Sequence, residues 1–145
     1  MRLSRKSCHV AAAALVAGLS TALTADARTA ASPGKTIASY CSSSGDVCYG
    51  IFNRSGEVYL RITTAARYFK RYNLCVRLLP AGSDATHAQR CGLYPVFRQG
   101  GSTWGSSINY TRQFPIKDPG RYRVAWKLGS SALGPPLYFR LPARS

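Results

Sequence analysis

The chain has 145 residues, of which 46% are hydrophobic, and its 20 lysines and arginines against 5 aspartates and glutamates give a net charge of +15. This length predicts one domain with a modest core, and no segment after the first 27 residues is apolar enough to cross a bilayer. The charge carries no information on the fold, but it favours attraction to polyanions.

The first 27 residues have the layout of a secretory signal peptide. Three basic residues lie among the first six positions, an apolar run follows over residues 10–23, and small residues end the segment at Ala27. Ser20 and Thr21 interrupt the run, which is shorter than the roughly 20 apolar residues of a membrane-spanning helix. We therefore expect cleavage after Ala27. The mature protein would have 17 basic and 4 acidic residues, a net charge of +13, and be secreted, either extracellular or loosely associated with the cell wall.

A change of composition near residue 40 divides the mature chain into a leader and a domain. Residues 28–39, RTAASPGKTIAS, are small and polar and show no apolar period, which is typical of a flexible leader. From Tyr40 onward, short apolar alternations and turn residues follow one another. We expect the folded domain to span residues 40–143.

The domain contains four cysteines, Cys41, Cys48, Cys75 and Cys91. An even number of cysteines in an exported chain predicts two disulfides, for which three pairings exist. Turn residues lie midway between Cys41 and Cys48, at residues 44–46, and midway between Cys75 and Cys91, at residues 80–84. Each pair would close its own hairpin, which favours the bridges 41–48 and 75–91. A zinc site is disfavoured, because zinc needs thiolates, which an oxidising compartment does not supply, and because the cysteine spacings differ from those of zinc knuckles.

Seven segments carry the period-two alternation of β-strands, bounded by glycine, proline, asparagine and serine. They lie at residues 47–52, 57–63, 74–79, 94–98, 104–114, 121–128 and 137–141. The residues expected to face the core are Val58, Leu60 and Ile62 in the second segment and Tyr122, Val124, Trp126 and Leu128 in the sixth. No segment of helical length shows a 3.6-residue period. The chain therefore predicts an all-β fold, a single antiparallel two-sheet sandwich.

The C-terminal segment DPGRYRVAWKLGSSALGPPLYFRLP, residues 118–142, resembles the last two strands of an immunoglobulin-like sandwich. It has a turn, then a tyrosine, an alternating strand, a glycine-rich hairpin and a closing strand. Tyr122 would occupy the tyrosine-corner position, with its ring in the core and its hydroxyl bonded to nearby backbone. Val124 stands where an antibody domain carries its second bridging cysteine. The resemblance is therefore to bacterial immunoglobulin-like modules of about seven strands.

Several motifs between Tyr40 and Pro142 are together similar to a family of small secreted proteins from actinobacteria. Among them are YCSSSGDVCYG, RYNLCV, STWGSSINYTRQFP and LGPPLYFRLP. The resemblance implies export, the two bridges and the β fold, and it implies no known activity. The closing strands also resemble those of periplasmic copper carriers. Those proteins use two histidines, whereas the mature chain has only His87, so we expect no copper site.

Catalytic groups are scarce in the mature chain. Its carboxylates are Asp46, Glu57, Asp84 and Asp118, of which Asp46 and Asp118 lie in turn contexts and Glu57 begins a strand. Asp84 and His87 are close in sequence, but a lone loop histidine is usually solvated, and no serine lies in a nucleophile elbow. We therefore expect no enzymatic activity, no cofactor and no metal site.

Basic and aromatic residues recur at outward positions of three predicted strands. They are Tyr59 and Arg61, then Arg121, Arg123 and Lys127, and finally Tyr138 and Arg140. If these strands are neighbours in one sheet, the residues form a cationic face, on which arginines take phosphate or sulfate groups while tyrosines stack on sugars or bases. Alternatively, the basic residues only keep an exposed sheet polar and soluble.

The segment RYFKRYN, residues 67–73, either joins the second predicted strand to the third or continues the alternation, with Tyr68, Lys70 and Tyr72 on one side and Arg67, Phe69 and Arg71 on the other. Phe69 is expected to plug the loop. Arg67, Tyr68, Lys70 and Arg71 are candidate contact residues, because three cations so close together cannot all be buried. The segment therefore predicts an exposed cationic tip.

The basic surface favours a secreted, non-enzymatic binding module for an anionic partner, either an anionic polymer of the cell envelope or an acidic protein, without specific readout of a nucleic acid. An alternative is a secreted inhibitor of a protease or other enzyme that presents the disulfide-braced loop 42–47, because a loop held in its bound shape loses less entropy on binding. Polyanion binding should weaken steeply with salt, whereas loop insertion should not. A cationic antimicrobial role is disfavoured, because the charge lies on a sandwich rather than on an amphipathic helix.

Overall fold

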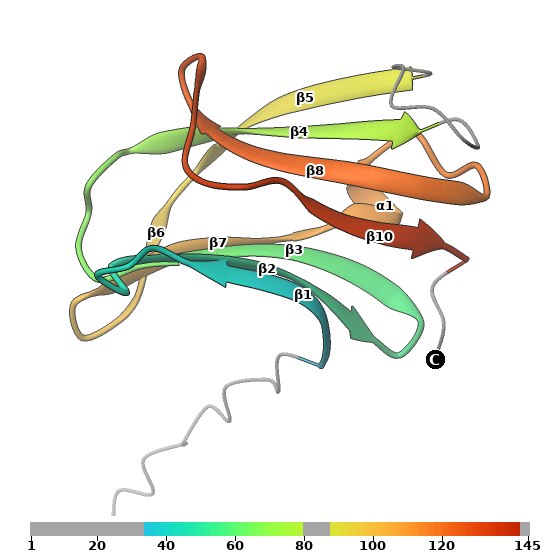
Figure 1. The fold of residues 1–145 in the computed structure, drawn as a ribbon. Coiled ribbons are helices and arrows are strands. Elements are labelled where there is room, and N and C mark those ends of the chain that lie inside the picture. The colour runs from blue at the N-terminus through green and yellow to red at the C-terminus, as the bar shows by residue number, and fades with distance from the viewer. Residues whose placement is uncertain (1–33, 80–87, 143–145) are drawn as a thin grey trace, which may run out of the picture. The chain divides into compact units, whose positions relative to one another are not determined.

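The computed structural model describes residues 34–79 and 88–142, which form two antiparallel β-sheets packed face to face (Figure 1). These residues therefore form an all-β sandwich, as the alternating segments predict. The expected signal peptide, residues 28–33 of the expected leader, and both Asp84 and His87 lie outside the described residues. Within the described part, no helix has the length and hydropathy needed to span a membrane.

Each sheet contains five strands (Figure 1). Sheet A has the order β1-β2-β3-β7-β6, with β1 at Lys35–Cys41, β2 at Val47–Arg54, β3 at Glu57–Thr64, β6 at Phe97–Gly100 and β7 at Thr103–Asn109. Sheet B has the order β10-β8-β4-β5, with β4 at Arg71–Leu79, β5 at Ala88–Pro95, β8 at Gly120–Leu128 and β10 at Leu137–Leu141. The two-residue β9, Ser131–Ala132, pairs with β8, and a short helix, α1, spans Tyr110–Gln113.

The core lies between the sheets and contains the alternate residues that the sequence periodicity identifies. The predicted inward residues that are buried are Val58, Leu60, Ile62, Tyr122, Val124 and Trp126. Leu128, predicted to point inward with them, is instead 45% exposed. The prediction is wrong there because β8 pairs with β4 only as far as Lys127, so Leu128 extends past this pairing toward the turn that follows.

The burial of the Tyr122 ring and the backbone hydrogen bond of its hydroxyl, both predicted for the start of β8, are confirmed. The Tyr122 ring is buried, and its hydroxyl donates a hydrogen bond to the backbone oxygen of Asp118 at 2.6 Å. The same ring stacks on Phe139 of β10, with 5.0 Å between the ring centroids. Tyr122 therefore anchors the connection that enters β8 and joins β8 to the last strand of the sheet.

The expected flexible leader is wrong for residues 35–39, which form most of β1. This strand pairs with β2 from Lys35 opposite Asn53 to Cys41 opposite Cys48. Its side chains are mostly exposed, so no apolar alternation marks it in the sequence. Backbone pairing along an edge of the sheet, which needs no particular side chains, holds it in place.

Two other predicted strands end early because the chain changes direction. The predicted strand 94–98 is divided between β5 in sheet B and β6 in sheet A, and Val96 at the crossing donates its backbone N–H to the Lys70 oxygen at 3.1 Å. The predicted strand 104–114 stops at Asn109, whose side-chain oxygen accepts a hydrogen bond from the Arg112 backbone N–H at 3.1 Å. Asn109 thereby caps α1 at its N-terminus.

Both predicted disulfides are present. Cys41 and Cys48 face each other across the β1–β2 pair, and Cys75 and Cys91 face each other across the β4–β5 pair. Each bridge therefore closes its own antiparallel pair, as the turn residues between the cysteines predict. Two such bridges indicate an oxidising environment.

Candidate functional site

The outer face of sheet B carries a group of basic side chains from three neighbouring strands. We call this group, with one tyrosine, the cationic face: Arg77, Arg121, Arg123, Lys127, Tyr138 and Arg140. Directly opposite one another across strand pairs are Arg121 and Arg140, Arg123 and Tyr138, and Arg77 and Arg123. The predicted residues of β8 and β10 therefore lie together on one surface.

Arg77 belongs to the cationic face but was not among the sequence candidates. It lies on β4 between Val76 and Leu78, both of which are buried, so its own side chain points outward. Its position in the alternating segment 74–79 marks it as outward-facing. That β4 is the neighbour of β8 is a feature of the tertiary structure.

Two cross-strand pairs in the cationic face place like charges opposite each other. Arg121 faces Arg140, and Arg123 faces Arg77, and such pairs directly across strands are destabilising. The one ion pair that the described residues contain, Arg112 with Glu57, involves sheet A. No carboxylate among the described residues therefore neutralises the cationic face.

Local contacts orient the guanidinium groups on this face. The Arg121 guanidinium lies over the Tyr138 ring, 4.5 Å from its centroid. Arg77 donates from Nε and Nη2 to the side-chain oxygen of Gln89 at 3.0 and 2.8 Å. The Arg123 Nε is buried and has no hydrogen-bond partner among the described residues. The arginines are thus partly fixed while charge and donor capacity remain available.

Two hollows adjoin these side chains. A small one of about 130 Å³ is lined by Arg77, Arg123 and Lys127 together with Cys75, Gln89 and Ala125. The larger, about 780 Å³, lies between the edge strands β1 and β10, and we call it the β1–β10 groove. It is lined by Lys35, Thr36, Ile37 and Asn53 from sheet A and by Arg121, Tyr138, Phe139 and Arg140 from sheet B.

Tyr59 and Arg61 do not belong to this surface. Both lie on β3 of sheet A, so the hypothesis that they share one face with β8 and β10 is wrong. The reason is topological, since β3 pairs with β2 and β7 only. Arg61 borders a separate hollow on sheet A, next to Gly50 and the Cys41–Cys48 bridge.

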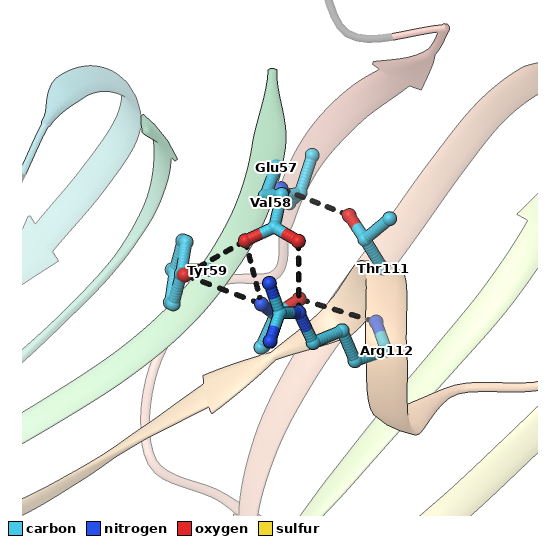
Figure 2. A network of polar contacts seen from close by, with 6 residues as sticks. Glu57, Val58, Tyr59, Thr111 and Arg112 are labelled. Carbon is cyan, nitrogen blue, oxygen red and sulfur yellow. Dashed lines mark hydrogen bonds and ion pairs between the residues drawn. The ribbon is translucent and has the colours of Figure 1, made fainter. Parts of the chain in front are cut away.

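Tyr59 takes part in a polar network that joins β3 to α1 (Figure 2). One carboxylate oxygen of Glu57 accepts hydrogen bonds from the Tyr59 hydroxyl and the Asn109 amide, each at 3.0 Å, and the other accepts from Arg112 Nε at 2.9 Å. Thr111 Oγ1 accepts from the Val58 backbone N–H at 3.1 Å. The network therefore holds α1 against the start of β3, a structural role.

The same network depresses the pKa of Glu57. The hydrogen bond from Arg112, followed by that from Tyr59, lowers this pKa below its ordinary value of 4.5. A carboxylate of lowered pKa stabilises the fold above its unfolded-state pKa, and this contribution is lost as the pH falls through the folded-state pKa. Acidification below pH 4.5 should therefore weaken the attachment of α1.

Replacing Glu57 by glutamine is expected to flatten the acid side of the stability profile, because glutamine does not titrate. The measurement is urea unfolding at pH 7 and at steps below pH 4.5. Asp118→Asn is the matched control, since Asp118 forms no ion pair with the described cations. An unchanged slope for Glu57→Gln would contradict the role assigned to the network.

The connection between β3 and β4 is the exposed cationic tip that the sequence predicts. Arg67, Tyr68, Lys70 and Arg71 are all exposed, while Phe69 is half-buried against the core. Arg67 lies over the Trp104 ring of sheet A, at 4.9 Å from its centroid. Arg71, in contrast, begins β4 and points to the same side of sheet B as Arg77. The tip therefore crosses from one sheet to the other, and only Arg71 extends the cationic face.

Core tyrosines also have altered acidity. Burial raises the pKa of Tyr49 and that of Tyr72 to about 12. Both hydroxyls form hydrogen bonds, Tyr49 with the Pro135 oxygen at 2.7 Å and Tyr72 with Ser106 at 2.7 Å.

Among the described residues, no group of three or more histidine, cysteine or acidic side chains is placed to hold a metal ion.

Comparisons with protein-family models, with curated proteins and with solved structures find no match to this chain.

Proposed function

We propose that the protein is a secreted, non-enzymatic binding module that holds an anionic partner of the cell envelope or extracellular space on its cationic face. The observation that carries the proposal is that two pairs of arginines, Arg121 with Arg140 and Arg77 with Arg123, lie directly opposite each other across strands, without a neutralising carboxylate among the described residues. A bound polyanion offsets the repulsion between these arginines, so binding should also stabilise the sheet.

The chemistry of the face suits phosphate or sulfate groups. Arginine offers two parallel N–H donors to such groups, and Arg77, Arg121, Arg123 and Arg140 lie on neighbouring strands of one sheet face. Tyr138 presents a ring beside these donors for stacking on a sugar. Contacts of this kind bind a charged backbone and do not involve the base edges, so no sequence-specific nucleic-acid recognition is proposed.

The strand order supports the assignment to immunoglobulin-like sandwiches. The order β2-β3-β7-β6 corresponds to strands A-B-E-D of that fold, and β10-β8-β4 corresponds to G-F-C, with β1 and β5 as extra edge strands. The tyrosine corner at Tyr122 supports the same assignment. Export, and membership of the actinobacterial family of small secreted proteins, rest on the signal-peptide pattern and on the motif resemblance, to which the two disulfides add support.

The test is retention of the disulfide-intact mature protein on immobilised long-chain polyphosphate across a salt gradient. The double variant Arg77→Gln/Arg123→Gln should elute at lower salt than the parent. Its slope of log K against log salt should fall by about one to two units, because each neutralised phosphate contributes roughly 0.7–0.9. Arg54→Gln/Arg61→Gln removes the same charge from sheet A and is the matched control.

Equal losses in the two double variants would show that net charge alone is responsible, and failure of the parent to bind at low salt would reject the proposal. In that second case, the disulfide-braced loop becomes the main candidate for an inhibitor. That loop has a specific feature in its favour: Ser42 N–H donates to the Val47 oxygen and Gly45 N–H to the Ser42 oxygen, both at 2.8 Å, inside the Cys41–Cys48 bridge. Inhibition through it should persist at high salt.

A further inference from the structure

We propose that the β1–β10 groove is a docking site for an extended acidic peptide segment of a protein partner, which adds as a new strand along the free edge of β10. Adding a strand to an exposed sheet edge is an established mode of peptide recognition, in which backbone hydrogen bonds provide affinity and alternate side chains provide specificity. The inference rests on the proposed function in that it takes Arg121 and Arg140 to receive the partner's negative charges.

The walls of the groove are the edges of two sheets. Three consecutive residues of β1, Lys35, Thr36 and Ile37, line one side, and residues 138–140 of β10 line the other. Each strand is the last of its sheet and pairs with a single neighbour, β1 with β2 and β10 with β8. Figure 1 shows the two strands along the same side of the sandwich. The free edge of β10 therefore offers unpaired backbone groups along the groove.

A β-bulge shapes the side of the groove formed by β1. Thr36 faces Phe52 and Ala38 faces the next residue, Ile51, so Ile37 is an extra residue with no partner in β2. Bulges bend a strand and re-aim a side chain. Here the side chain is 40% exposed, although isoleucine is large and apolar, and it lines the groove. The bulge thus places a large apolar side chain on the wall of the groove, where an apolar side chain of a bound segment can pack against it.

The charges along the groove have one sign. Its cationic side chains are Lys35, Arg121 and Arg140, and no acidic residue lines it. The guanidinium of Arg121 is held over the Tyr138 ring, next to Arg140 on the neighbouring strand. A strand added to β10 would place its outward side chains opposite Tyr138 and Arg140, on the outer face of sheet B. Carboxylates at those positions meet the arginines directly.

The pleat of the added strand determines which side chains alternate with its carboxylates. Phe139 points into the core, opposite in direction to Tyr138 and Arg140. The inward side chains of an added strand would therefore lie beside Phe139 and the exposed Ile37, where apolar groups fit. The segment that matches the groove alternates acidic with apolar residues. A phosphate polymer has neither this period nor the amide donors that a free strand edge accepts.

The test uses a blocked hexapeptide in which glutamate alternates with valine, and measures its binding to the disulfide-intact mature protein by calorimetry. Two further peptides of the same sequence carry N-methyl groups on alternate residues. In one peptide these groups lie on one backbone edge, and in the other they lie on the opposite edge. Both versions keep every carboxylate, and we expect one of them to lose tenfold or more in affinity, because two or three backbone hydrogen bonds are removed (about 1.4 kcal/mol per factor of ten).

The protein variant Arg121→Gln/Arg140→Gln should also weaken binding of the parent peptide, whereas Arg54→Gln/Arg61→Gln should not. Equal affinity for the parent peptide and both methylated peptides would overturn the proposal, since charge alone would then explain binding. Absence of peptide binding, together with salt-sensitive retention on polyphosphate, would reject the groove as a peptide site while the cationic face stands. Failure of both ligands to bind would reject the two proposals together.

Discussion

Replacing Trp126 by alanine is expected to lower the free energy of unfolding by about 3–5 kcal/mol, the range for deleting a large buried aromatic side chain. Trp126 lies on β8 and is 1% exposed, and its ring stacks on Tyr49 of β2 with 4.5 Å between centroids. Tyr49 in turn packs on Tyr40 of β1, at 5.1 Å. The stack therefore joins sheet B to sheet A through the core.

Urea unfolding followed by circular dichroism measures this effect, and Trp126→Phe provides the informative control. The indole N–H is buried without a hydrogen-bond partner among the described residues, so phenylalanine removes an unsatisfied donor while retaining most of the ring. We expect Trp126→Phe to cost less than half as much as Trp126→Ala. A cost for the alanine variant below about 1 kcal/mol would show that the site collapses around the deletion and that the stack is not central to stability.

Removing the Cys75–Cys91 bridge in the variant Cys75→Ser/Cys91→Ser is expected to cost about 3 kcal/mol, because the bridge closes a loop with a sequence separation of 16. It ties the centre of β4 to β5, which pairs with no other strand of sheet B. Loss of the bridge should therefore loosen β5 first, and amide hydrogen exchange in Ala88–Pro95 should accelerate more than in β4.

The second bridge supplies the comparison for this prediction. Cys41→Ser/Cys48→Ser opens a loop with a sequence separation of 7, for which the same entropy argument gives about 2.5 kcal/mol. Chemical unfolding of both variants at one pH measures the difference. A larger loss for the shorter loop would indicate that the bridges act through native-state packing rather than through the unfolded chain.

Side-chain periodicity predicted the elements whose two faces differ. β3, β4, β8 and β10 each have one face in the core, so their apolar residues alternate and can be recognised without a structure. β1 escaped recognition because most of its side chains are exposed and its stability comes from backbone pairing with β2. The helix α1 was missed because four residues are too short for a 3.6-residue period, although Asn109 is a suitable N-cap.

The candidate site was predictable in part for a related reason. Alternation identified Arg121, Arg123, Lys127, Tyr138 and Arg140 as outward residues, and the hairpin of β8 and β10 brings them together. Alternation gives the side of a strand but not the identity of its neighbours. The pairing of β4 with β8 added Arg77, and the placement of β3 in the other sheet separated Tyr59 and Arg61.

The two disulfides, the buried Tyr122 with its backbone hydrogen bond and the all-β class were predictable from the sequence, because each depends on residues close together in the chain or on a period of two. The tertiary structure alone decided which basic residues share a surface and that β1 and β10 form the walls of a groove. These features depend on pairing between strands far apart in the sequence. Such pairing follows from how the two sheets jointly bury their apolar faces, and no local pattern encodes it.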